Sequence, residues 1–242
     1  LFDAEVKQAY QGKAELVGAV RQRRGVEGSV VKFPKVGKGV ATLRVPQTDV
    51  TPLNAGWSQV TATLADWNAA AAWFVCVCCF NLAASSTSLT VSNDIGATDS
   101  NLNVAKLREA KRLLDKNNVP PEKRHIVLHG NNLASLLSET AVTSSDFNTV
   151  KALVAGEINT FLGFTFHVLG DRSEGGLAID GSNDRTIFAF HSDAVGYAEG
   201  IAPRTEINYI PEKTSFLVNA VFSATATTID AEGIVQLTCR ES

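Results

Sequence analysis

Methionine is absent from all 242 residues, and cysteine is confined to Cys76, Cys78, Cys79 and Cys239. Three of these four lie too close together to build a disulfide framework, which excludes a small disulfide-stapled secreted domain and favours a reducing compartment. The first residues, Leu1 to Glu5, lack the basic start and apolar stretch of a secretory signal. Because position 1 is not methionine either, we expect the natural start of the protein to be missing from this sequence.

A strong charge of either sign is also lacking, since 22 basic and 25 acidic residues leave a net charge of −3. This balance excludes the overall basic surface that is typical of dedicated DNA-binding proteins and of proteins that bind anionic membranes. The longest apolar run, residues 69–80, continues past Asn81 only to Ala84, whereas a bilayer-spanning helix needs about 20 such residues. The run therefore favours a buried helix or strand, and we expect no membrane partner.

Signatures of catalysis and of metal binding are missing too. The Gly37–Gly39 segment has a lysine between two glycines but neither the spacing nor the Ser or Thr of a phosphate loop. His125 and His129 lie four apart on an expected strand, about 13 Å from each other, which is too far for one metal ion. No Gly-x-Ser-x-Gly elbow occurs, and the clustered cysteines are expected to be small buried apolar residues. We expect no catalytic residue, no cofactor and no metal.

The N-terminal part of the chain alternates in the manner of strands. Residues 30–36 and 40–45 predict a hairpin around a turn at Gly37–Gly39, and residues 59–64 predict a further strand. Asp66-Trp67-Asn68 is typical of a helix start, because Asp and Asn accept hydrogen bonds from first-turn amides.

The middle of the chain predicts helices and the end predicts strands. Leu107, Ala110 and Leu113 recur at helical spacing over residues 104–116, with Asn103 as the cap. A strand at 124–129 follows, then a helix starting at 131–133 and another from 146 to 154. Strands are expected over residues 164–168, 186–190, 204–209, 215–229 and 233–239. This order predicts an α+β fold in which the two ends of the chain pair in one sheet.

Four stretches carry a resemblance to a known family: Phe2 to Gln8, Asn103 to Arg108, Phe161 to Phe164 and Ile229 to Gly233. Together with the helix, strand, helix order from residue 103 to 133, they make the chain resemble podovirus-like major capsid proteins of tailed phages. The resemblance implies the Hong Kong ninety-seven phage type of fold. Its parts would be an N-terminal arm (1–27), an extended loop (28–56), a first peripheral part (57–101), an axial domain (102–203) and peripheral return strands (204–242).

One segment departs from that family pattern. Relatives carry a long amphipathic spine helix where this chain has the apolar run, so residues 69–88 are anomalous. Either this member has a shortened spine, or the sequence departs there from the natural one. The abrupt change of composition favours the second hypothesis, which peptide mass spectrometry matching residues 69–88 would refute.

The resemblance also implies a function. Many copies would form pentamers and hexamers that close into an icosahedral shell around double-stranded DNA held without sequence selection, together with scaffolding, portal or decoration proteins. Assembly would take place in the bacterial host cytoplasm, and the product would be the virion capsid. Expected contacts between subunits are basic residues of the arm and loop: Arg21, Arg23, Arg24, Lys35, Lys38 and Arg44. An encapsulin-like protein compartment, or a small α+β enzyme, are the alternatives.

Overall fold

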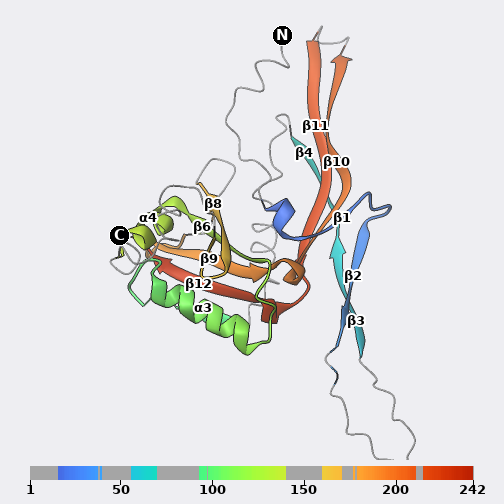
Figure 1. The fold of residues 1–242 in the computed structure, drawn as a ribbon. Coiled ribbons are helices and arrows are strands. Elements are labelled where there is room, and N and C mark those ends of the chain that lie inside the picture. The colour runs from blue at the N-terminus through green and yellow to red at the C-terminus, as the bar shows by residue number, and fades with distance from the viewer. Residues whose placement is uncertain are drawn as a thin grey trace, which may run out of the picture.

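The fold is described from a computed structural model, in which residues 16–37, 39, 56–69, 93–96, 98–139, 160–170, 177, 179–210 and 215–241 are placed. Within these ranges the chain forms three β-sheets, two α-helices and three short 3₁₀ turns. The arrangement is α+β, as the sequence predicts (Figure 1).

The largest sheet has six strands and lies beside both α-helices (Figure 1). Its order is β5 (Asn93–Ile95), β12 (Ile234–Arg240), β9 (Asp184–His191), β6 (Arg124–His129), β8 (Phe164–Leu169) and β7 (Thr160–Phe161). The central strand β9 is buried on both faces, which matches its continuous apolar sequence. The main core forms between this sheet and the helices, and its largest fully buried side chains include Phe164, Phe190, Leu107, Leu114 and Ile126.

Helix α3 (Val104–Lys116) has the bounds that the sequence predicts. Its Leu107, Ala110 and Leu114 are fully buried, and the Asn103 side chain accepts a hydrogen bond of 2.8 Å from the Lys106 amide. The second helix, α4 (Gly130–Ser138), follows β6 directly, starts one residue before the predicted position and has His129 as its cap.

Replacing Asn103 with Ala is expected to lower the free energy of unfolding by about 1 kcal/mol, because one first-turn amide of α3 loses its acceptor. For a chain of this size that is a fall in Tm of about 2–4 °C. Thermal unfolding followed by circular dichroism measures it. Asn103→Asp keeps an acceptor and should stay close to wild type, so an equal loss in both variants would contradict the capping role.

Arg124 closes the turn between α3 and β6 from a buried position. Its guanidinium donates to the carbonyl oxygens of Val119 (2.6 Å) and Pro120 (2.9 Å) and pairs with Asp115 at 2.7 Å. The turn therefore needs a cation at the first position of β6.

The second sheet has four strands and contains the two longest strands of the chain. Its order is β1 (Arg21–Arg24), β10 (Val195–Ile210), β11 (Ser215–Thr228) and β4 (Ala65–Ala69). β10 and β11 form a long antiparallel ribbon (Figure 1), and β1 pairs with β10 in parallel. Because β4 also pairs with β11, strands from the N-terminal and C-terminal parts of the chain meet in this sheet, while the last strand, β12, lies in the six-stranded one.

Short 3₁₀ turns surround this sheet and link it to the six-stranded one. The turn η1 (Val17–Ala19) precedes β1, η2 (Ser192–Ala194) joins β9 to β10, and η4 (Ala231–Gly233) joins β11 to β12. Because η2 and η4 lie side by side, the two sheets are tied together at one junction.

The third sheet is a two-stranded ribbon formed by β2 (Val30–Val36) and β3 (Trp57–Thr63). The predicted hairpin was wrong about the partner: residues 30–36 pair with 57–63, and the Gly37 amide still bonds the Gly56 carbonyl oxygen at 2.7 Å. The ladder thus runs through Gly37, where the sequence predicted a turn. Residues 40–45 lie outside the described residues.

The predicted helix start at Asp66-Trp67-Asn68 was also wrong. These residues lie in β4, whose backbone pairs with residues 220–224 of β11. Pairing with a strand more than 150 residues away outweighs the local preference of Asp and Asn for a helix cap. The apolar run after Ala69, the expected helix from 146 to 154 and the first 15 residues lie outside the described part of the chain.

Candidate functional site

The ribbon β2–β3 is rooted on the four-stranded sheet by its inner face. Val31, Phe33 and Ala62 are buried there, in a cluster with Ala198 and Ile229. At Gly196 of β10 a Cβ atom would lie 3.0 Å from the Phe33 ring, so glycine is what lets the ribbon approach this closely. The direction in which the ribbon leaves the body is therefore fixed by packing.

An ion pair of Lys35 also connects the base of the ribbon to the rest of the subunit. Its Nζ lies 2.8 Å from Oδ1 of Asp230, in the loop between β11 and β12. The two side chains are 40% and 39% exposed, so the pair is partly open to solvent. Predicted as a contact between subunits, Lys35 lies in an ion pair within its own subunit, at the junction of the sheets. Lys38 and Arg44, from the same prediction, lie outside the described residues.

The three predicted arginines lie together on β1, all exposed. β1 is an edge strand, with β10 on one side and no further strand among the described residues on the other. Arg23 donates to the carbonyl oxygen of Lys32 at 3.0 Å, and Arg24 donates to Oε1 of Gln22 at 3.0 Å. Both arginines keep their remaining guanidinium donors near the surface.

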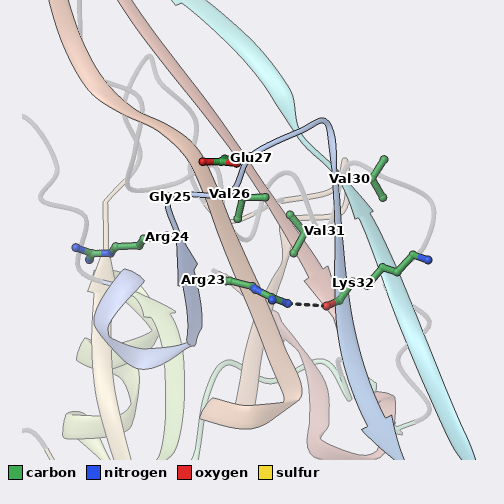
Figure 2. Close-up of a pocket in the computed structure, with 8 residues that line it drawn as sticks. All are labelled: Arg23, Arg24, Gly25, Val26, Glu27, Val30, Val31 and Lys32. Carbon is green, nitrogen blue, oxygen red and sulfur yellow. Dashed lines mark hydrogen bonds between the residues drawn. The ribbon is translucent and has the colours of Figure 1, made fainter.

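A concavity of about 490 Å³ opens between β1 and β2 (Figure 2). Its lining includes Glu27, Val26 and Val31, and Arg23 reaches across it to the Lys32 carbonyl oxygen, whereas the Lys32 ammonium and the Arg24 guanidinium point away from it on opposite sides (Figure 2). The concavity is therefore not a cluster of converging cations. It offers no convergent pair of titratable groups of the kind that acid–base chemistry needs.

The outer face of the ribbon carries exposed apolar side chains that the sequence analysis missed. Trp57 is 76% exposed and lies directly opposite Val36, which is 52% exposed. A signal was present in the sequence. Side chains alternate between the two faces of a strand, so in residues 57–63 Trp57 lies on the face opposite to Ala62. The predicted strand began at Gln59 and therefore did not include Trp57.

Two half-buried histidines lie side by side on the neighbouring strands β6 and β8 of the six-stranded sheet. Nδ1 of His125 is 3.1 Å from Nε2 of His167, and the His125 ring also packs against Phe190. Burial, together with the nearby His167 and His191, lowers the pKa of His125 from 6.5 to about 4. The prediction that histidines are packed is confirmed for His125. In the described part of the chain no group of three or more His, Cys, Asp or Glu side chains could hold a metal ion.

The last strand ends in a cluster of buried polar groups. Burial lowers the pKa of Lys106, whose Nζ donates to the carbonyl oxygens of Ser100 (2.7 Å) and Thr238 (2.9 Å). Burial also raises the pKa of the Cys239 thiol to about 11, so this cysteine is a protonated, packed residue at neutral pH. The clustered cysteines that were expected to be buried, Cys76, Cys78 and Cys79, lie outside the described residues.

Comparison with known proteins shows the family of this chain. The sequence model of a family described as phage capsid protein matches residues 1–74 and 78–241. This chain belongs to that family. The family is one of structural proteins, so the predicted capsid identity is confirmed.

Solved structures share the fold of this capsid protein over nearly its whole length. The capsid of Cyanophage P-SCSP1u is 16% identical, with a TM-score of 0.67 over 97% of this chain and 90% of that chain. The acid-stable capsid of Helicobacter pylori bacteriophage KHP30 is 9% identical, with a TM-score of 0.68 over 97% and 93%. A virus-like particle from Pyrococcus furiosus is 12% identical, with a TM-score of 0.60 over 97% and 94%. Curated protein sequences give no match.

Among the described residues of the capsid protein, no helix is both long and apolar enough to cross a membrane.

Proposed function

We propose that this capsid protein assembles into pentamers and hexamers that close into an icosahedral shell around double-stranded DNA. The observation that carries the proposal is the ribbon β2–β3, which projects from the body (Figure 1) and carries the exposed apolar side chains of Val30, Val36 and Trp57. Closed shells need several modest interfaces per subunit, each too weak alone to trap errors. The ribbon supplies one interface and the exposed β1 strand another.

The charged residues take different parts in this proposal. Arg21, Arg23 and Arg24 contact carboxylates of a neighbouring subunit, whereas Lys35 uses Asp230 of its own subunit to hold the ribbon's direction. Lys38 and Arg44 add further contacts from the loop. A net charge of −3 supports DNA that is enclosed without sequence selection. Scaffolding, portal or decoration proteins are further proposed partners, in the bacterial host cytoplasm. The division into arm, loop, peripheral and axial parts stays a prediction.

Replacing Arg21, Arg23 and Arg24 with Gln is expected to raise the protein concentration needed for assembly about tenfold, because each exposed ion pair contributes about 0.2–1 kcal/mol. The salt sensitivity of assembly should fall in the same variant, since fewer charges remain to be screened. Light scattering at 50 and 300 mM salt measures both. Arg108→Gln with Lys116→Gln, on the exposed face of α3, is the matched control. If the control weakens assembly equally, the arginines of β1 have no special role.

Electron microscopy of the purified protein at moderate and low salt tests the function itself. Closed shells or capsomer rings support it, and the ratio of absorbance at 260 and 280 nm tells DNA-filled shells from a protein compartment. A uniformly small particle at both salts, which persists when scaffolding protein is added, would overturn the proposal.

A further inference from the structure

The outer face of the β2–β3 ribbon gathers apolar side chains that its own subunit leaves exposed. Six large apolar side chains are exposed among the described residues, and Val30, Val36 and Trp57 lie on this one face. The neighbouring positions on the face are Lys32, Pro34, Gln59, Thr61 and Thr63, all exposed. Exposed apolar residues scattered singly need no explanation, but three on one short ribbon do.

Trp57 dominates this face. It is 76% exposed, stands opposite Val36 in the ladder and lies next to the backbone bond between the Gly37 amide and the Gly56 carbonyl oxygen. Two-stranded ribbons are marginal alone and need a packing surface, which the described residues of this chain provide on the inner face of the ribbon. A tryptophan on a strand of fixed position supplies a large contact area at low entropic cost, which is why tryptophan is enriched at interface hot spots.

We infer that Trp57, with Val36 beside it, is the apolar anchor by which the ribbon docks on a second copy of this chain. The inference rests on the proposed shell and adds which residue provides the ribbon's binding energy. Charge complementarity favours a second copy as the occupant: the outer face carries Lys32 and no carboxylate, while the chain as a whole is acidic and exposes carboxylates such as Asp193, whose side chain is 72% exposed.

The size of the anchor fits the same occupant. A tryptophan and a valine bury about 200–300 Å² together, far less than the roughly 800 Å² per partner of an independent stable complex. Such a contact works as one of several around a closed shell.

Trp57→Ala is expected to raise the concentration at which shells form by at least tenfold, with no change in the Tm of the dissociated subunit, because Trp57 has little contact with its own core. Gln59→Ala, on the same outer face and the same strand, is the matched control and should assemble like wild type. Trp57→Phe should recover part of the loss. Benzoylphenylalanine placed at position 57 should cross-link, on irradiation of assembled shells, to a peptide of another copy.

The outcomes separate the two claims. If wild-type protein forms shells and Trp57→Ala forms them equally well, the anchor is overturned while the proposed function stands. Cross-linking of position 57 to a different protein, or within its own subunit, overturns the second copy as occupant. If wild-type protein forms no shells with or without scaffolding protein, the proposed function fails and the inference fails with it.

Discussion

Glu241→Gln is expected to lower the free energy of unfolding of the subunit by about 3–5 kcal/mol, because it leaves the buried charge of Arg185 without its counter-ion. The Arg185 side chain is 3% exposed, and its Nε lies 2.6 Å from Oε1 of Glu241, which is 11% exposed. Asn131 donates to the other carboxylate oxygen at 3.1 Å. Glu241, which directly follows β12, thus links this strand to β9 and to the start of α4.

The protonation of this carboxylate agrees with that role. Burial alone would raise the pKa of Glu241, but hydrogen bonds from Arg185 and Asn131 and the charges of Arg185 and His129 outweigh it and leave the pKa below its ordinary value. The group is therefore ionised in the folded subunit at neutral pH, which is the state that Arg185 requires.

Denaturant unfolding of the dissociated subunit at pH 7 measures the loss, and a fall in Tm of about 10 °C should accompany it. Glu122→Gln, at an exposed position, is the matched control and should change stability by less than about 0.5 kcal/mol. The double variant Arg185→Met with Glu241→Leu should regain much of the loss, because it leaves no buried charge. A single variant as stable as the control would show that the pair contributes nothing.

Local signals were enough to predict some elements of this fold. Helix α3 was predicted with its bounds because its apolar spacing and its Asn103 cap both lie within the helix itself. The same holds for β6 and β9, whose apolar runs lie within the strands themselves. In each case the information needed lies within about 15 residues.

Long-range pairing decided the elements that the sequence did not predict. β4 is a strand because β11 lies beside it, and β2 pairs with β3 across the loop rather than with the next apolar run. Contacts of the site follow the same rule: Lys35 meets Asp230 195 positions later, and His125 meets His167 42 positions later. Nothing in the local sequence of either residue specifies its partner.

The histidine pair gives the subunit an expected sensitivity to acid. The folded pKa of His125, about 4, lies below the unfolded value of 6.5, so folding disfavours the protonated ring. Its contribution to stability is fully present above pH 6.5 and is lost as the pH falls toward 4. The full shift amounts to about 3 kcal/mol, which we reduce to about 2 kcal/mol because the ring is only partly buried.

His125→Gln should remove this part of the pH dependence, since glutamine can still bond His167 but does not titrate between pH 7 and 5. The free energy of unfolding of the wild-type subunit should fall by about 1–2 kcal/mol across that interval, and the variant should stay nearly level. Below pH 4.5 both proteins should lose stability together, because Glu241 titrates in each, and this shared loss is the internal control. A slope between pH 7 and 5 that survives in His125→Gln would assign the acid sensitivity to other groups. A flat wild-type profile would mean that the packing around His125 and Phe190 tolerates the charge.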